Sequence, residues 1–371
     1  MQLLGETNID FIKWRKVAFI ISIIAIVVGL SSIALKGGLG LGLDFTGGME
    51  THLKFENSFE IGRIRSALSG VGLGGAVIQR YGPQEENTVL IRYHLEEISD
   101  VIATNIIDYR QSKGEFQSIE ELKNIPGIEG IGYENLITEL TLDIERIDKI
   151  NLNKATKDAL ASVIQDVTSR EMASKIQEAI QTEFVNKENP FEILSVSLMG
   201  PKVSEELQRN ALLAIAFSLI GMLIYIGWRF EFRFAAGAVI ALAHDVVIAV
   251  GLLSLFNFEF TLPIVAAILT IIGYSLNDTI VVYDRIRENI KTLRKKKLPS
   301  KKILNLSINQ SLSRTLITSL TTFIVVLILF LWGGEPLRGF TFALLVGVIV
   351  GTYSSSFVAT PVIYAWGKTK K

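Results

Sequence analysis

Six long apolar stretches alternate with polar sequence along the 371 residues of the chain. They cover residues 17–35, 211–228, 234–256, 262–283, 315–332 and 340–366. An α-helix rises about 1.5 Å per residue, so about 20 apolar residues cross the roughly 30 Å hydrocarbon core of a bilayer. The pattern therefore predicts a polytopic α-helical membrane protein with six transmembrane helices, of which the first is a retained anchor.

The basic residues predict the orientation of these helices. Lys and Arg equal Asp and Glu at 37 each, so the distribution of charge is more informative than its sum. Nine Lys and Arg lie within residues 285–302, whereas residues 257–261 contain none. Since cytoplasmic loops retain Lys and Arg, we expect a basic cytoplasmic loop over 284–314, a cytoplasmic N-terminus over 1–16 and a cytoplasmic C-terminus. The protein is then a multi-pass membrane protein with both termini on the cytoplasmic side.

Residues 36–210, which follow the first helix, are expected to form an extracytoplasmic domain, and residues 211–371 a five-helix membrane domain. Strand-like patterns occur at residues 49–55, 76–82, 88–95 and 191–200, with a helical pattern at 59–68. Strands interleaved with helices predict a small α+β ferredoxin-like domain.

Residues 98–185 differ in character, because they are charged, amide-rich and helix-forming. Two pieces, at 106–132 and 150–164, resemble halves of a helix-hairpin-helix module, whose turns often hold DNA phosphates. This segment carries about as many acidic as basic residues and is expected to face outward, whereas a DNA binder would show a basic face. We therefore expect a helical insertion with a structural or protein-contact role and no nucleic-acid partner.

Motifs of enzymatic chemistry are absent from the sequence. It contains no phosphate-binding loop, no H-E-x-x-H zinc pair, no G-x-S-x-G elbow and no cysteine. The stretch GVGLGG at 70–75 follows a helical pattern and enters a strand, the reverse of the dinucleotide-binding context. We expect no enzyme activity, cofactor or metal.

Ionisable residues inside the apolar stretches are the most informative chemistry. A charge at mid-bilayer costs about 2.5 to 3.5 kcal/mol on insertion scales, so such groups suggest function. His244 and Asp245 lie within the third span, where they form either a structural polar pair or a functional one. Arg314 opens the fifth span and either extends to the lipid headgroups or faces a partner. Asp278, next to Asn277, has no cation within a turn of its own helix.

Asp278 therefore needs a partner from another helix, or it is protonated part of the time. Burial favours the protonated form of a carboxyl group, and a nearby arginine favours the charged form. If Asp278 moves towards and away from Arg314, a proton is taken up on one side and released on the other. Asp278, Arg314 and Asn277 are thus the predicted proton relay, with His244 and Asp245 as a secondary polar site.

Five motifs in order along the chain resemble the bacterial protein-export subunit SecF, a relative of the RND transporters. The resemblance covers roughly residues 8–60 and 195–366, and the region 98–185 departs from it. The motifs are GLDFTGG at 42–48, which contains Asp44, Phe45, Gly47 and Gly48, then GAVIALAHDVVI, IGYSLNDTIVVYDRIREN, SLSRTLITSLTT and GVIVGTYSSSFVATP.

The resemblance implies a SecD partner, association with the SecYEG channel and contacts with YajC and YidC. It implies that the proton-motive force, used together with SecD, promotes late translocation of unfolded preproteins across the lipid of the cytoplasmic (inner) membrane, in which the protein itself would lie. The family's proton-linked Asp falls on Asp278 and its partner Arg on Arg314.

Two alternatives stay open from the residues themselves. One is an RND-type half-transporter that exports a small molecule or lipid, which a deep apolar pocket in the external domain would favour. A shallow groove or an open sheet edge would instead favour a peptide, because extended chains bind by strand addition. The other alternative is a non-transporting assembly scaffold, whose buried charges only orient helices.

Overall fold

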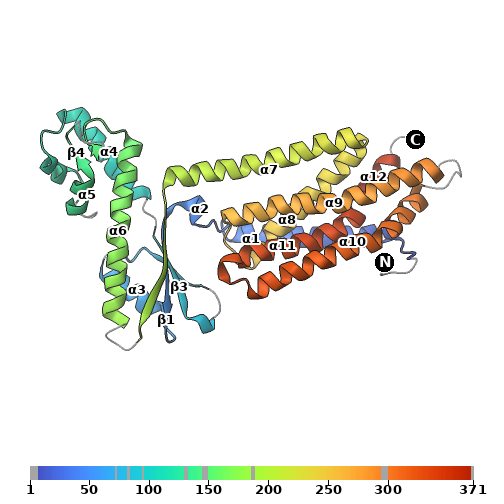
Figure 1. The fold of residues 1–371 in the computed structure, drawn as a ribbon, viewed down its shortest axis with the longest axis horizontal. Helices are drawn as coiled ribbons and strands as arrows, with labels where there is room; N and C mark the ends of the chain where they lie inside the picture. The colour runs from blue at the N-terminus through green and yellow to red at the C-terminus, as the bar shows by residue number, and fades with distance from the viewer. Residues whose placement is uncertain are drawn as a thin grey trace. The chain divides into compact units, whose positions relative to one another are not determined.

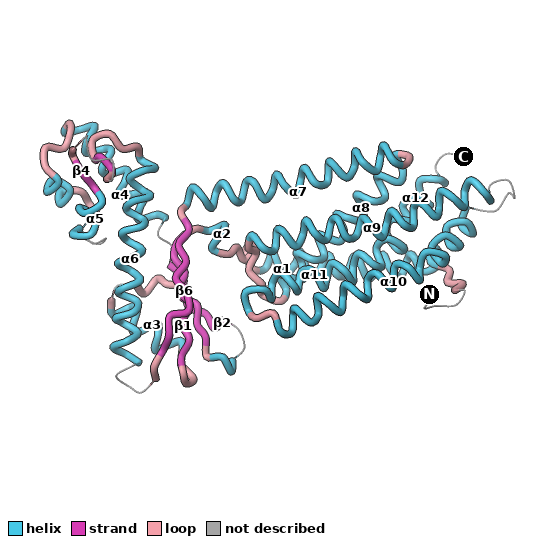
Figure 2. The backbone as a smooth tube through the Cα atoms, viewed as in Figure 1, coloured by secondary structure: helices cyan, strands magenta, loops and turns pink. Residues whose placement is uncertain are grey.

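The computed structural model describes residues 7–71, 73–81, 84–93, 96–128, 133–143, 149–184, 189–293 and 300–368 (Figures 1 and 2). Several predicted segments lie in part outside the described residues: 1–6 of the N-terminus, 294–299 of the basic loop, and 129–132, 144–148 and 185 of the insertion. The chain forms two compact units, Met1–Gly42 with Gln208–Lys371, and Leu43–Leu207.

The first unit is a helical bundle, here called the membrane unit, and among the described residues it holds six helices that are long and apolar enough to span a membrane. The predicted six-helix membrane protein is thus confirmed. The helices are α1 Phe11–Leu35, α7 Pro201–Arg229, α8 Phe232–Leu255, α9 Leu262–Leu293 and α10 Ser300–Trp332. The sixth consists of α11 Glu335–Ser354, a π-helical turn Ser355–Ala359 and α12 Thr360–Lys368.

Helices α9 and α10 continue well into the segment predicted as a basic loop, to Leu293 and from Ser300. Their apolar positions repeat with helical spacing beyond the apolar stretches, and Ile286, Ile290 and Ile308 pack on the bundle core. Hydropathy identifies only the uniformly apolar part of a helix. It therefore predicts a loop where these polar helical extensions lie.

The start of α1 is fixed by a capping contact to α10. Asp10 is the N-cap residue and accepts a hydrogen bond from the backbone N–H of Lys13. Lys301 on α10 donates to the same carboxylate at 2.7 Å, and Asn305 donates at 2.7 Å. The hydrogen bond from Lys301, followed by those from Asn305 and Lys13, holds the pKa of Asp10 below its usual range despite some desolvation.

Close helix packing in the membrane unit depends on small residues. Gly29 of α1 and Gly251 of α8 face each other, and a Cβ added at Gly29 would lie 2.6 Å from the Cα of Gly251. In a membrane, where apolar burial does not favour helix association, such close approach provides van der Waals contact. A larger side chain at either glycine would therefore separate these helices.

The second unit, here called the external unit, contains a four-stranded antiparallel sheet with the strand order β2-β3-β1-β6. The strands are β1 Gly48–Phe55, β2 Val77–Tyr81, β3 Thr88–Tyr93 and β6 Phe191–Met199. Helices α3 Ile61–Gly70 and α6 Lys157–Phe184 pack on it, around a core that includes Met49, Leu53, Phe55, Ile64 and Phe184. The α+β class is as predicted, and the ferredoxin-like assignment stays a prediction with which this strand order is compatible.

The insertion has a hydrophobic core of its own. The insertion comprises α4 Glu96–Lys113, the 3₁₀ turn Ile119–Asn124, α5 Tyr133–Glu139, the short strands β4 Leu140–Thr141 and β5 Ile150–Asn151, and the first half of α6. Ile164 on α6 lies in this core, whereas Ile180 on the same helix lies in the sheet core. Since one continuous helix contributes to both cores, the insertion is held firmly to the sheet.

Candidate functional site

Asp278 lies in the buried stripe of α9 and faces α10. Its side chain is only 2% exposed, because positions 271, 275, 278 and 282 share the face that packs into the bundle. Ser319 on α10 donates to Asp278 Oδ2 at 3.2 Å, and Thr352 Oγ1 on α11 lies 2.8 Å from Ser319 Oγ. The partner from another helix that the sequence required is therefore a hydroxyl group.

The two other residues of the predicted relay lie apart from this contact. Asn277 is exposed on the bundle surface, since one residue along a helix turns the side chain by about 100°. Arg314 is also exposed, and although its charge acts on Asp278, no ion pair within 4.0 Å joins them among the described residues. The pairing of Asp278 with Arg314 stays a prediction.

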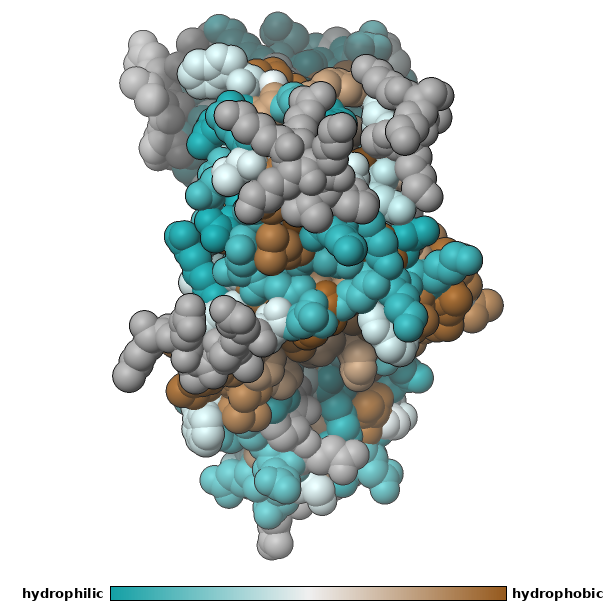
Figure 3. Space-filling view, turned by 90° about the vertical axis from the view of Figure 1, so that its right-hand side faces the viewer, coloured by the Kyte–Doolittle hydropathy of each residue, from teal (hydrophilic) through white to brown (hydrophobic). Residues whose placement is uncertain are grey.

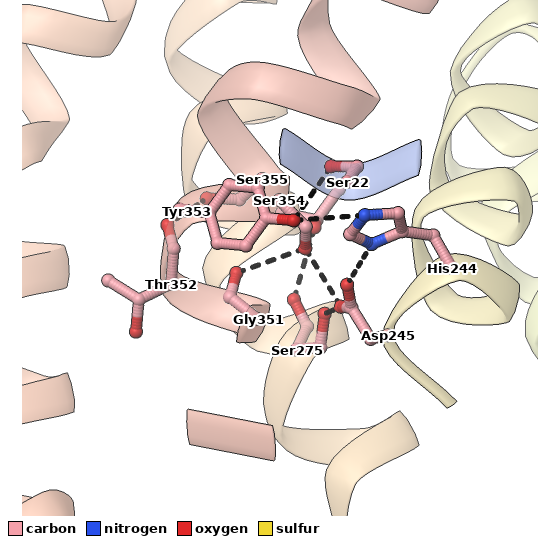
Figure 4. Close-up of polar contacts among 10 residues, drawn as sticks. Ser22, His244, Asp245, Ser275, Gly351, Thr352, Tyr353, Ser354 and Ser355 are labelled. Atoms are coloured by element: carbon pink, nitrogen blue, oxygen red, sulfur yellow. Dashed lines mark hydrogen bonds and ion pairs between the residues drawn. The ribbon is translucent and has the colours of Figure 1, made fainter. Parts of the chain in front are cut away.

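A second buried carboxylate, Asp245 on α8, is surrounded by hydrogen-bond donors (Figure 4). His244 Nδ1 lies 2.8 Å from Asp245 Oδ1. Ser275 of α9 and Ser354 of α11 donate to Oδ2 at 2.5 and 2.8 Å. A glycine makes this convergence possible, because a Cβ at Gly351 would lie 3.0 Å from Cβ of Ser275.

The other imidazole nitrogen of His244 continues the network towards α1. His244 Nε2 lies 3.0 Å from the hydroxyl of Tyr353, which in turn lies 2.8 Å from Ser22 Oγ (Figure 4). The rings of His244 and Tyr353 also meet edge to face, with centroids 5.7 Å apart. Helices α1, α8, α9 and α11 are thus joined through a single histidine–aspartate pair.

Sequence reasoning missed the hydroxyl partners of both carboxyl groups. Within the late motif GVIVGTYSSSFVATP, Thr352 belongs to the Asp278 site, and Tyr353 and Ser354 belong to the Asp245 site. The same motif then forms the π-helical turn Ser355–Ala359, where Thr360 donates to the carbonyl oxygen of Ser355 five residues earlier. Such turns are rare and are frequently found at functional sites.

The external motif forms the entry to the sheet. Leu43–Thr46 is a single helical turn, α2, in which Phe45 is buried. Gly47 and Gly48 then have φ values of 66° and 106°, which side chains with a Cβ rarely adopt. Asp44 lies in this same turn, so the motif sets the backbone path into β1.

A charged cluster lies on the sheet of the external unit. Arg92 on β3 pairs with Glu50 Oε2 on β1, and His52 Nε2 lies 2.7 Å from Glu50 Oε1. Burial of Glu50 acts to raise its pKa, but the hydrogen bonds and charges of His52 and Arg92 outweigh it and hold the pKa below its usual range. Glu50 is therefore a charged, fully paired group at neutral pH.

A shallow groove of about 490 Å³ lies between the sheet and α6 in the external unit. It is lined from both sides by apolar and polar side chains, among them Leu53, Ile193, Val196, Arg170 and Ala173. Strand β6 ends the sheet among the described residues, and Leu194, Val196 and Leu198 on it are 40 to 49% exposed. A sheet edge with exposed apolar side chains is a place where an extended chain can pair.

Six membrane-spanning helices with buried carboxyl groups and an imidazole, joined to an α+β domain, define a polytopic membrane protein with intramembrane ionisable sites. A family model described as "Protein export membrane protein SecD/SecF, C-terminal" matches residues 179–369, and a helix-hairpin-helix motif model matches residues 89–141.

The similarity to known proteins extends over the whole chain. The protein translocase subunit SecF of Koribacter versatilis is 38% identical over 99% of this chain and 93% of its own length. That of Vibrio alginolyticus is 36% identical over 100% of this chain and 93% of its own. The chain belongs to the SecF family of protein translocase subunits, which confirms the resemblance.

Two solved structures have the same architecture. One is the crystal structure of SecDF, described as a translocon-associated membrane protein, from Thermus thermophilus. It has a TM-score of 0.69 and 30% identity, and the match covers 98% of this chain but 39% of the solved chain. A second SecDF structure, in a form called super-membrane-facing, gives a TM-score of 0.59 at 30% identity and is covered over 40% of its length. This chain thus spans about two fifths of the SecDF chains.

Proposed function

We propose that this chain acts with SecD as an accessory subunit of the Sec export machinery and uses the proton-motive force to promote late translocation of unfolded preproteins. The single observation that carries the proposal is Asp278, a carboxyl group buried among membrane helices whose contact is a hydroxyl group rather than a cation. Structural carboxylates inside a bilayer are expected to be paired, whereas a transport carboxyl group has to change its charge.

The contrast with Asp245 supports this role for Asp278. Asp245 has three polar partners at 2.5 to 2.8 Å, which hold its side chain in one place between α8, α9 and α11. Asp278 has hydroxyl groups of α10 as its partners, Ser319 at 3.2 Å and Thr318, and no cation is bonded to it among the described residues. Arg314 lies five residues before Ser319 on the same helix, about 7.5 Å along its axis. Approach of its guanidinium to Asp278 would favour the charged carboxylate and release the proton.

The features of the external unit favour an extended polypeptide as its ligand. The groove between the sheet and α6 is open and lined by polar as well as apolar groups, and β6 offers exposed apolar side chains at the sheet edge. A small-molecule exporter would need a pocket that encloses most of its ligand. The half-transporter alternative is therefore the weaker of the two.

The proposed partners follow from the family. SecD is the first, because the solved structures that this chain resembles are described as SecDF. SecYEG, with YajC and YidC, would complete the assembly. The proposed location is the cytoplasmic membrane with both termini inside. Figure 3 shows the end of the membrane unit at which α9 ends and α10 begins in Figure 1, and hydrophilic residues gather across the middle of that face.

The test is proton-driven export in membrane vesicles that carry Asp278→Asn together with SecD and the channel. We expect a loss of at least about tenfold in the proton-dependent rate, since an amide cannot carry a proton. Asp284→Asn is the matched control, because Asp284 lies on the same helix, its side chain is 47% exposed, and it forms a surface ion pair with Arg229.

Full proton-dependent export by Asp278→Asn would remove Asp278 from the mechanism. If Asp278→Asn and Arg314→Gln both leave export intact while loss of the chain destabilises the complex, the protein is an assembly scaffold. Recovery of SecD by co-purification with each variant separates a loss of coupling from a loss of assembly.

A further inference from the structure

His244 is a buried imidazole that the role of Asp278 does not use. Its side chain is 8% exposed, and both of its ring nitrogens have a hydrogen-bond partner. Imidazole is the side chain whose ordinary charge change falls between about pH 5 and pH 8. The surroundings of His244 therefore decide whether it is a fixed structural group or one that binds a proton.

The ring nitrogens of His244 have hydrogen-bond partners in both charge states of the ring. When the ring is neutral, Nδ1–H donates to Asp245 and Nε2 accepts from the hydroxyl of Tyr353. When a proton from water binds at Nε2, Nε2–H donates to the oxygen of Tyr353, whose hydroxyl turns to donate to Ser22. A hydroxyl pair can reverse its direction in this way because each oxygen both donates and accepts.

Asp245 would stabilise the imidazolium form of His244 inside the bundle. It contacts the imidazole at 2.8 Å and is itself held by Ser275 and Ser354, so an imidazolium here would be paired at once. On the helices that contact this pair, α1 presents Ser22, α9 presents Ser275 and α11 presents Tyr353 and Ser354. The titratable groups of the described network that face His244 are therefore Asp245 and Tyr353.

The two ionisable sites meet on three consecutive residues of α11. Thr352 contacts Ser319 in the Asp278 site, while Tyr353 and Ser354 contact His244 and Asp245. The π-helical turn begins at the next residue, Ser355. The hydroxyl groups of the two sites are thus on adjacent residues, next to the point where the helix departs from regular geometry. A change in hydrogen-bond direction at one site therefore occurs beside the other site.

From this geometry we propose that His244 is a second proton-binding site of the membrane unit, with Asp245 as its counter-ion and with Tyr353 and Ser22 as the hydroxyl pair that reorients when the proton binds. Segment Thr352–Ser354 couples it to the Asp278 site. The coupling rests on the proposed function of Asp278, whereas proton binding by His244 does not.

The test is a nitrogen-15 NMR titration of the full chain, labelled at histidine and reconstituted with SecD in lipid bilayers. His52→Gln and His94→Gln leave His244 as the reporting imidazole. As the pH is lowered from about 9 to about 5, we expect the signals of its two ring nitrogens to change from those of a neutral tautomer to those of the imidazolium. An imidazole that keeps one charge state over this range would overturn the proposal.

Two further variants distinguish proton binding from a purely structural bond. Tyr353→Phe keeps the ring against His244 but removes the hydroxyl that bonds Nε2 in both charge states. Because a hydrogen bond to a charged group is the stronger one, the ratio of imidazolium to neutral imidazole at a given pH should fall about tenfold. Asp284→Asn changes an exposed ion pair outside this network, and should leave the tautomer change in place. An unchanged titration in Tyr353→Phe would contradict the assigned hydroxyl pair.

The functional readout is kept separate from the titration. His244→Gln should lower proton-driven export at least about tenfold while SecD is still recovered, whereas Asp284→Asn, at an exposed ion pair outside the network, should retain most of it. If the titration succeeds but export by His244→Gln is normal, the coupling to Asp278 is wrong. If Asp278→Asn exports normally and His244 still titrates, the proposed function of Asp278 fails and the proton site stands.

Discussion

Replacing Asp245 by leucine tests how the membrane unit is held together, because the two side chains are similar in size and leucine has no acceptor. The change removes the bonds from Ser275 on α9 and Ser354 on α11, which connect these helices to α8. Measured hydrogen bonds between membrane helices average about 0.6 and reach about 1.7 kcal/mol, so the two serines account for about 1 to 3 kcal/mol. The N–H of His244, left without an acceptor, adds about 1 to 3 kcal/mol.

The total expected loss in the free energy of helix association is therefore about 2 to 6 kcal/mol. Removal of the carboxyl group also relieves its insertion cost of about 2.5 to 3.5 kcal/mol, but this cost is shared by associated and dissociated helices within the bilayer. It therefore cancels from the association free energy. The assay is unfolding of the full chain in lipid bilayers, measured by steric trapping.

Asp245→Asn is the conservative partner of this variant. Its carbonyl oxygen can take the place of Oδ2 and keep both serine bonds, while its NH₂ group faces His244, which then accepts at Nδ1 as the other tautomer. The expected loss is below about 1.5 kcal/mol, one hydrogen bond at most. Asn277→Leu, at an exposed position of α9, is the control and should not destabilise. Equal stability of the leucine and asparagine variants would refute the assigned network.

Three further predictions follow from other parts of the chain. Glu50→Gln should destabilise the external unit by about 1 to 3 kcal/mol at pH 7, measured by hydrogen exchange of β1 and β3. Since the pKa of Glu50 is lowered in the folded chain, this contribution is present above the ordinary carboxyl range and is lost as pH falls through the folded value, so wild type and variant should converge in acid. Gly351→Val should cost about 1 to 3 kcal/mol by pushing α11 away from Ser275, while Ala should cost less, as thermal melts in detergent would record. Arg110→Met should expose the insertion to protease, because Arg110 donates to three backbone carbonyl oxygens of residues 152–155, and a variant as resistant as wild type would contradict that role.

The sequence predicted the membrane-spanning helices and the unusual position of Asp278, because both depend on quantities carried by the chain itself. Span length is a count of consecutive apolar residues, and a carboxyl group among them stands out in the sequence before its partners are known. The sequence did not predict the ends of the helices. The extensions of α9 and α10 are amphipathic, and their helical structure is stabilised by residues such as Ile286 and Ile308 that pack on the bundle.

Only the tertiary structure decided the partners of the ionisable groups. Serine and threonine in a helix commonly bond to the carbonyl group one turn earlier, as Thr279 does to Ser275, so their presence in a span does not reveal a contact across helices. Whether Ser275, Ser319 or Ser354 reaches a carboxylate depends on helix rotation and on close approach at positions such as Gly351. The sequence by itself therefore located the charge within the membrane, while the packing of α9, α10 and α11 determined which groups bind it.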